Sequence, residues 1–221
     1  EGNAGKVNDE DVFYLRELGI DAPSITFYFE GGLRSLVAFQ NRHVEPIHKN
    51  IFHVEKEQDG VAVEVSLQYV DDITSRISAF ANNIYNSEGG MHITGFKTAL
   101  TRTLNSALKN GNGKDNDTFT GDDVREGLTA VISVKMREVQ FEGQTKSKLG
   151  SVEARGAVEA VFSEAFATFL EEHPDDARAI FGKVTLAMKA RKAAKAAKES
   201  ILRKGALDGL ALPGKLADCQ T

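Results

Sequence analysis

The segment 61–69 constrains the fold more strongly than any other part of the chain. Every second residue in it is apolar: Val61, Val63, Val65, Leu67 and Tyr69. Successive side chains of a β-strand point to opposite faces, so this period-2 pattern predicts a strand with one buried face. The segment 130–136 alternates in the same way and predicts another strand. We expect the segment 77–80 to pair with the first strand, so the chain should contain a sheet.

Three further segments carry apolar residues at the spacing of an amphipathic helix: 33–39, 96–108 and 158–170. Thr94 can cap the second helix, and Thr120 with Asp123 makes a capping-box-like start for a short helix over 122–128. The third helix should end at His173, because a residue that precedes proline avoids the α region. A short strand is also predicted at 25–29. Strands and helices in this order indicate an α+β fold.

A long helix is predicted in the C-terminal part of the chain. From Pro174 to Lys204 the only helix breaker is Gly182, so we expect one helix of about 30 residues, roughly 45 Å long. Acidic residues stand at its start and basic residues at its end, as the helix macrodipole favours. Its second half is rich in alanine and lysine and offers little bulk for a core. We therefore expect this helix to project from the globular body.

The composition restricts where the chain can work and what it can bind. With 41% hydrophobic residues it has enough apolar material for one or two cores, and its net charge of −5 argues against a generally basic nucleic-acid-binding surface. The single cysteine, Cys219, cannot form an internal disulfide, and no run approaches the roughly 20 apolar residues of a membrane helix. There is neither an initiator methionine nor a signal-peptide pattern. We expect a cytoplasmic piece of a longer protein, without membrane association.

Three local patterns resemble ligand sites but lack something that such a site requires. The segment 209–215 fits the start of a P-loop, but Leu216 stands where a hydroxyl must bind magnesium. The segment 115–126 has three acids at EF-hand positions but lacks the fifth ligand and the obligatory glycine. Three histidines recur every five residues, which matches neither helix nor strand: His43, His48 and His53. We therefore predict that the first pattern is a structural turn and that the second is a loop with a helix cap. The three histidines are not expected to form a metal site.

Two cationic features have both a structural and a functional interpretation. Lys146 follows Gln144 at a predicted loop tip, where it is either a solvated residue or a compact cation that can reach a phosphate. The basic run over 189–204 is by default a solvated helix surface. Within it, Arg191, Lys195 and Lys198 fall on one side at helical spacing and could form a stripe that faces phosphates.

Seven longer strings connect the chain to a known family. They are residues 29–33 (FEGGL), 82–92 (NN followed by GGMH), 101–105 (TRTLN), 121–127 (GDDVREG), 144–146 (QTK), 203–206 (RKGA) and 212–219 (LPGKLADC). In wording and order they resemble the transducer region of the DNA gyrase B family of bacterial type IIA DNA topoisomerases. The resemblance covers nearly everything after Phe27.

The resemblance implies a fold and a domain organisation. The expected fold is similar to domain 2 of ribosomal protein S5: a mixed sheet with helices on one face, a left-handed crossover and a long projecting C-terminal helix. Residues 29–173 would be the transducer domain. Residues 174–221 would form the long helix and the linker toward the DNA-cleavage (Toprim) domain. Residues 1–28 match poorly and are either a separate segment or the end of the ATPase domain.

The resemblance also implies roles for individual residues. Lys146 would bind the γ-phosphate of ATP held by the neighbouring ATPase domain, with Gln144 beside it, and Arg102 would contact DNA. Arg191, Lys195 and Lys198 are also predicted to contact DNA, but only their helical spacing supports this prediction. The catalytic glutamate, the magnesium-binding asparagine and the glycine-rich nucleotide motifs of the family are absent. ATP and Mg²⁺ are therefore expected in the full-length enzyme, while this piece should be inactive, with no bound cofactor and no complete catalytic set.

The implied function is the coupling of ATP binding and hydrolysis to DNA strand passage and negative supercoiling. The implied partners are DNA and the gyrase A protein, in an A2B2 heterotetramer. A second copy would dimerise with this one through the missing ATPase domain when ATP binds. The expected location is the cytoplasm, on chromosomal DNA. One alternative is the same domain in the B subunit of topoisomerase IV. Another is an RNA-binding module of ribosomal type, against which the acidic charge and the lack of an aromatic stacking platform argue.

Overall fold

The computed structural model describes residues 30–110 and 118–210, the last ten by their backbone alone. The strand predicted at 25–29 and the linker predicted at the end of the segment 174–221 lie outside the described residues, as do residues 111–117. No helix in the described part of the chain is long and apolar enough to cross a membrane.

Five strands form the central sheet in the order β1-β2-β6-β3-β4. Their bounds are β1 Phe52–Gln58, β2 Val61–Tyr69, β3 Arg76–Ala81, β4 Ile84–Tyr85 and β6 Leu128–Met136. The two strands predicted from alternation are confirmed, and they are antiparallel neighbours. The expected pairing of 77–80 with 61–69 is wrong, because β6 lies between them and β3 runs parallel to β6. The first seven residues of β6 are all buried, as a central strand covered on both faces requires.

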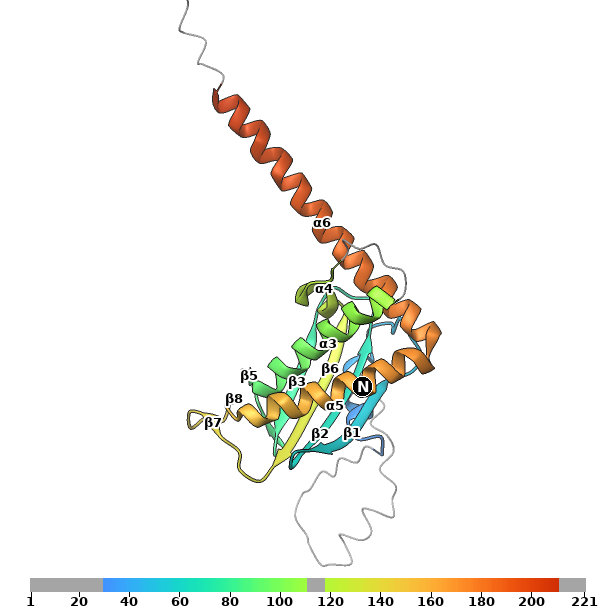
Figure 1. Ribbon diagram of the computed structural model, residues 1–221, viewed down its shortest axis with the longest axis vertical. Coiled ribbons are helices and arrows are strands. Elements are labelled where there is room, and N and C mark those ends of the chain that lie inside the picture. Colours follow the sequence, from blue (N-terminus) through green and yellow to red (C-terminus); the bar gives the residue numbers. More distant parts are fainter. Residues whose placement is uncertain (1–29, 111–117, 211–221) are drawn as a thin grey trace, which may run out of the picture.

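Two long helices cover one face of this sheet. They are α3, Met91–Asn110, and α5, Val152–Glu172, which pack against each other across the strands (Figure 1). Phe52 of β1 meets three phenylalanine rings of α5 edge-on, at centroid distances of 5.3 to 5.5 Å. Each fully buried ring of this kind contributes about 1.5–3 kcal/mol. The main core therefore lies between the sheet and this helical layer.

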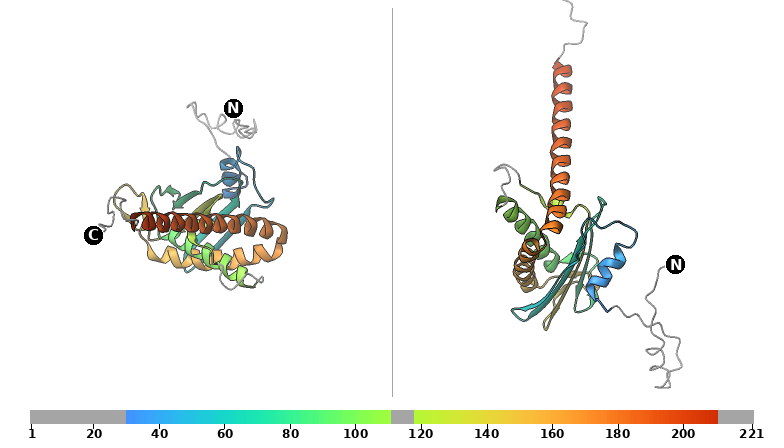
Figure 2. Two further views of the ribbon diagram at one scale, coloured as in Figure 1. Left: turned by 90° about the horizontal axis from the view of Figure 1, so that it is seen from above. Right: turned by 90° about the vertical axis from the view of Figure 1, so that its right-hand side faces the viewer.

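A short helix, α2 (Leu33–Gln40), packs on the opposite face of the sheet, as the right-hand view of Figure 2 shows. The expectation of helices on one face only is therefore wrong for this segment. Only Val37 of α2 is buried, and the face that it covers is partly polar. Asn41 donates to Gln68 Oε1 at 3.1 Å, and Gln40 donates to Ser78 Oγ at 3.1 Å. These amide contacts explain how a weakly apolar helix can pack against the sheet.

The start of α3 and the bounds of α4 differ from those predicted. α3 begins at Met91, and Thr94 lies within its first turn, where its hydroxyl donates to Gly90 O instead of capping the helix. α4 spans only Gly121–Arg125, although its capping box between Thr120 and Asp123 is confirmed. It ends early because Gly127, at φ +70°, turns the chain into β6 where a Cβ atom would lie 2.6 Å from Val70 O.

The last helix, α6, spans Pro174–Leu210 and runs away from the globular body (Figure 1). It continues six residues beyond the predicted end at Lys204, so Gly205 does not terminate it. Its first half packs against the body through buried residues such as Ile180 and Val184. Every described side chain from Lys192 to Ser200 is exposed.

A second, three-stranded sheet adjoins the N-terminus of α3. It consists of β5 Gly89–Gly90, β7 Phe141–Glu142 and β8 Lys148–Leu149, in the order β5-β8-β7. Gly90, at φ +136°, brings the backbones of β5 and β8 so close that a Cβ atom would lie 2.3 Å from Leu149 O. The turn between β7 and β8 carries the predicted loop-tip lysine.

Candidate functional site

The β7–β8 hairpin presents Gln144, Thr145 and Lys146 at its exposed tip. Gly143 at φ +83° and Lys146 at φ +55° both adopt the left-handed backbone conformation. That conformation costs a residue with a Cβ atom about 1–2 kcal/mol, so the surrounding structure must hold Lys146 in it.

Residues that precede α3 provide this hold. The buried side chain of Asn86 donates to Lys146 O at 2.8 Å. Ser147 Oγ donates to Glu88 Oε1 at 3.0 Å, and Glu88 N donates to Ser147 O at 3.0 Å. The tip of the hairpin is therefore tied to the segment 86–88 through both backbone and side-chain contacts.

The two lysines of the hairpin differ in their surroundings. Lys148 Nζ forms an ion pair with Glu142 Oε2 at 2.8 Å, and this hydrogen bond and the carboxylate charge raise the pKa of Lys148. Lys146 has no hydrogen bond or ion pair through its ammonium group to any of the described residues. The backbone of Lys146 is thus fixed while its charge remains available to a group outside the described chain.

Arg102 lies on α3 and reaches across to α5. Its guanidinium donates to Ser163 Oγ at 3.1 Å and lies 3.7 Å from Glu159 Oε2. It lines a groove of about 500 Å³ between the two helices, which also includes Thr103 and Phe181. The side chain is 55% exposed, so a phosphate can approach it without first breaking a buried contact.

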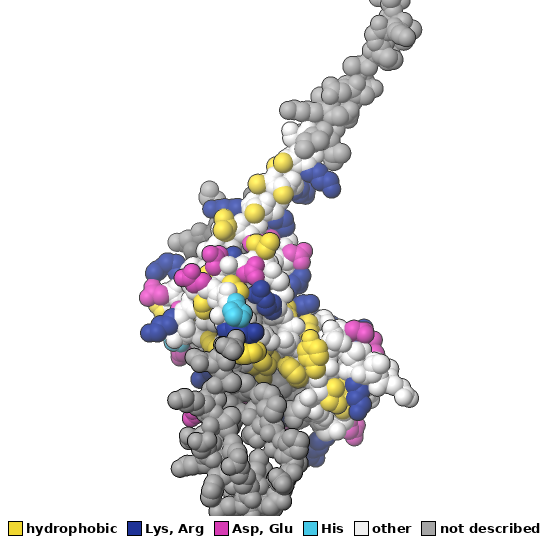
Figure 3. Space-filling model, turned by 180° about the vertical axis from the view of Figure 1, so that it is seen from behind, with side chains coloured by type: hydrophobic (Ala, Val, Ile, Leu, Met, Phe, Trp, Pro, Cys, Tyr) yellow, Lys and Arg dark blue, Asp and Glu magenta, His cyan; other side chains and the backbone are white. Residues whose placement is uncertain are grey.

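The three residues of the predicted basic stripe do not share one environment. Arg191 makes a bidentate ion pair with Asp123, at 2.8 Å from Nε and 2.9 Å from the terminal nitrogen. Burial raises the pKa of the Asp123 carboxyl, but hydrogen bonds from Arg191 and Thr120 outweigh this effect and leave it below its ordinary value. Lys195 and Lys198 are exposed further along α6, where Figure 3 shows basic side chains in dark blue.

The three histidines are the remaining sequence pattern that the described residues include in full. Backbone Tyr69 N donates to His48 Nε2 at 2.9 Å, whereas His53 Nδ1 lies 2.8 Å from Ser66 Oγ, so these two histidines have separate surroundings. The P-loop-like segment and the acids of the EF-hand-like segment lie mostly outside the described residues. Sequence reasoning missed the partner of Asp123. The capping box marked this acid, but no local signal connects it with a residue 68 positions away.

Solved structures identify the class of protein to which this fold belongs. The chain is similar to the 43K ATPase domain of Thermus thermophilus gyrase B, solved with an aminocoumarin, with a TM-score of 0.72 and 35% identity over 78% of this chain and 47% of that one. It also shares its fold with the topoisomerase IV ATP-binding domain of Francisella tularensis, with a TM-score of 0.65 and 23% identity over 84% of this chain and 54% of that one. The chain therefore has a mixed α/β fold similar to about half of the ATPase-domain structure of a type II topoisomerase.

The family follows from the sequence comparisons. The family model for DNA gyrase B matches residues 32–200. The B subunit of DNA gyrase from Haloferax lucentense is 51% identical over 201 residues, which are 90% of this chain and 32% of the relative. Its counterpart from Bacillus mycoides is 53% identical over 197 residues, 88% of this chain and 49% of the relative. The chain belongs to the DNA gyrase B family and spans about a third to a half of the length of these relatives.

Proposed function

We propose that this chain is the transducer part of an ATP-hydrolysing type II DNA topoisomerase, which couples ATP binding and hydrolysis to strand passage and negative supercoiling. Residues 29–173 would form the transducer domain, similar to domain 2 of ribosomal protein S5, and residues 174–221 the connection to the DNA-cleavage domain. The observation that carries the proposal is the anchored hairpin with a single unpaired cation at its tip.

Lys146 is the residue to which we assign γ-phosphate binding, with Gln144 beside it. Its backbone is fixed by Asn86 and its ammonium is free of partners among residues 30–110 and 118–200. A unit charge about 4 Å from a phosphate oxygen gains on the order of 4 kcal/mol at an effective dielectric of about 20, before desolvation is subtracted. Hydrolysis removes that contact, so the position of the hairpin would depend on the state of the nucleotide.

Packed elements connect the hairpin with the projecting helix. β8 pairs with β5, which leads directly into α3, and α3 has its most extensive packing with α5. α5 is joined to α6 at the His173–Pro174 corner, where Ala177 N donates to His173 O at 2.9 Å. A shift of the hairpin would therefore move rigid, contiguous elements, as a mechanical coupling requires.

DNA would be contacted by Arg102 and by the exposed part of α6. Lys195 and Lys198 stay in this proposal. The bidentate contact of Arg191 with the buried Asp123 instead favours a structural role for that residue. ATP and Mg²⁺ would bind to the ATPase domain of the full-length protein, which would dimerise on ATP binding and assemble with gyrase A into an A2B2 heterotetramer. The isolated chain would be inactive.

The runner-up is the same part of the topoisomerase IV protein that binds ATP, which has a similar fold. The ribosomal-type alternative has no support, because the gyrase B family match covers residues 32–200. A single assay separates the first two. The full-length protein with its partner protein should introduce negative supercoils into relaxed circular DNA when ATP is added. Relaxation or decatenation without supercoiling would favour topoisomerase IV.

The role of the hairpin is tested in the same assay with two variants. Lys146→Ala should reduce the ATP-dependent supercoiling rate at least ten-fold, because the triphosphate contact is lost. Lys148→Ala is the matched control, since it removes a lysine from the same hairpin that already pairs with Glu142. Equal rates for Lys146→Ala and the unmodified protein would refute the assignment.

A further inference from the structure

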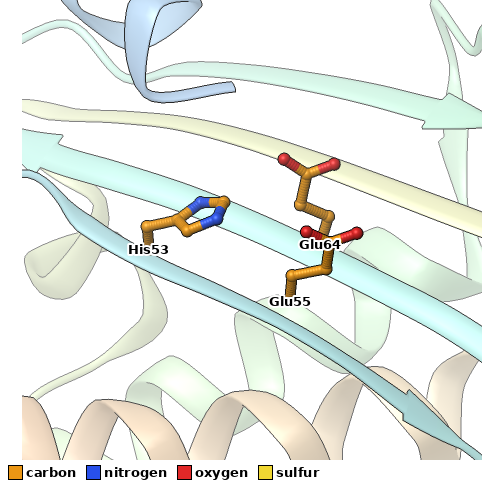
Figure 4. Close-up of side chains that lie close together, drawn as sticks. All are labelled: His53, Glu55 and Glu64. Atoms are coloured by element: carbon orange, nitrogen blue, oxygen red, sulfur yellow. The ribbon is translucent and has the colours of Figure 1, made fainter. Parts of the chain in front are cut away.

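Three metal-ligating side chains come together on the face of the sheet that carries α2. His53 and Glu55 are two residues apart on β1 and point to the same face, and Glu64 lies directly opposite Glu55 on β2. One potential ligand atom from each residue lies within 4.8 Å of the other two. Figure 4 shows the imidazole turned toward the two carboxylates.

The histidine is held in a way that suits a metal ligand. Ser66 is the cross-strand partner of His53, and its hydroxyl lies 2.8 Å from Nδ1. A metal-bound histidine almost always uses its second ring nitrogen for such a hydrogen bond, which fixes the ring and the tautomer. Burial and the charge of Arg34 lower the pKa of His53, more than Glu64 and Glu55 raise it. Because Ser66 occupies Nδ1, Nε2 is the ring nitrogen that remains for a metal ion.

The two glutamates face each other without an ion pair to the described residues, although the charge of Arg34 acts on the neighbouring His53. Like charges directly opposite each other on neighbouring strands are destabilising. Neither Glu55 nor Glu64 forms a hydrogen bond or an ion pair with a lysine or arginine in the described parts of the chain. Lys56, the residue beside Glu55, points to the other face and pairs with Glu164 of α5. A cation between the carboxylates would replace this repulsion with two attractive contacts.

We propose that His53, Glu55 and Glu64 bind one Zn²⁺ ion. Zinc accepts imidazole nitrogen and carboxylate oxygen at about 2.0–2.2 Å, which places tetrahedral ligand atoms about 3.4 Å apart. Rotation of the two flexible glutamate side chains closes the present separation, and water completes the coordination. The ion would link the edge strand β1 to β2 and stabilise the hairpin that they form.

Calorimetry with ZnCl₂ on the chelator-treated, tag-free chain tests the proposal. One ion per chain should bind in the micromolar range or tighter, and His53→Ala and Glu64→Gln should each weaken binding at least ten-fold. His43→Ala, which removes an exposed histidine outside the cluster, and Cys219→Ser should leave the affinity unchanged. No binding, or binding lost only in the His43→Ala or Cys219→Ser variant, would overturn the site.

Thermal unfolding provides a second readout, in which each protein is compared with itself in the presence and absence of zinc. Without metal, Glu64→Gln should melt at or above the temperature of the unmodified chain, because it removes the like-charge pair. At a ZnCl₂ concentration that saturates the unmodified chain, its melting temperature should rise, and that of Glu64→Gln should rise less. An equal increase in both proteins would show that zinc binds elsewhere and would refute the proposal.

Discussion

The contact between Asp123 and Arg191 fixes the base of the projecting helix, and Asp123→Asn should reveal its contribution. The carboxylate accepts three hydrogen bonds, one from Thr120 N at 2.8 Å and two from the guanidinium at 2.8 and 2.9 Å. Its side chain is only 2% exposed, whereas that of Arg191 is 38% exposed. In the variant one acceptor for Thr120 N remains, while the amide NH₂ group opposes the donors of Arg191.

The expected loss follows from these partners. Hydrogen bonds to a charged group contribute about 1.5–3 kcal/mol each, but Arg191 regains water when the carboxylate is lost. We therefore expect the free energy of unfolding to fall by about 2 kcal/mol, a decrease of roughly 4–8 °C in melting temperature for a chain of this size. Asp122→Asn is the matched control. Its side chain is 87% exposed and pairs with Arg125, so it should change the stability by less than about 0.5 kcal/mol.

Urea denaturation at a series of pH values tests both the size and the origin of this loss. Because the folded pKa of Asp123 is depressed, its stabilisation is fully present above the unfolded value of about 3.9 and is lost as the pH falls through the folded pKa. The difference between the unmodified chain and Asp123→Asn should thus be constant from pH 5 to 7 and shrink below about pH 4. A difference no larger than that for Asp122→Asn, or one that persists at the acid end, would refute the reasoning.

Three further predictions concern the core, a helix and the residues that we propose to contact DNA. Phe162 is fully buried between Phe52, Phe96 and Phe166. Phe162→Ala should lower the free energy of unfolding by about 3–5 kcal/mol, as measured by chemical denaturation. A loss below about 1 kcal/mol would mean that the core is loosely packed there. Gly156 is exposed within α5, and a Cβ atom there would lie in open space. Gly156→Ala should raise the free energy of unfolding by about 0.5–1 kcal/mol. A decrease would contradict the helical assignment at that point. In the full-length protein, Arg102→Ala should flatten the slope of log DNA affinity against log salt by about 0.9, and Lys195→Gln with Lys198→Gln by up to about 1.8. Unchanged slopes would restrict these residues to solvated or structural roles.

Sequence periodicity predicted the strands and helices well where one face is apolar and the other polar. The alternation of 61–69 and the stripe of 158–170 correspond to β2 and α5, because burial on one face imposes that period on the sequence. Strand order was not predictable in this way. Whether β3 pairs with β2 or β6 depends on the crossover through α3, which leaves no local pattern.

In the candidate site too, local patterns were predictable from the sequence, and contacts between residues far apart in the sequence were not. The loop position of Lys146 and the capping box at Asp123 were visible as local patterns. The hydrogen bond from Asn86 to Lys146 O joins residues 60 positions apart, and the ion pair of Arg191 with Asp123 joins residues 68 positions apart. The cluster of His53 with Glu55 and Glu64 was not predicted, because the spacing of the histidines gives no sign of it. A pair of strands brings together residues at i and i+2 and the residue that faces them on the next strand.

The central claim is that Lys146 senses the γ-phosphate, and nucleotide affinity tests it most directly. Titration calorimetry on the full-length protein would compare ADP with a non-hydrolysable ATP analogue, in the unmodified protein and in the Lys146→Ala and Lys148→Ala variants. We predict that Lys146→Ala lowers the affinity for the ATP analogue at least ten-fold and leaves the ADP affinity unchanged, while Lys148→Ala alters neither. An ATP-analogue affinity that Lys146→Ala leaves intact, or an equal loss for both nucleotides, would contradict the account.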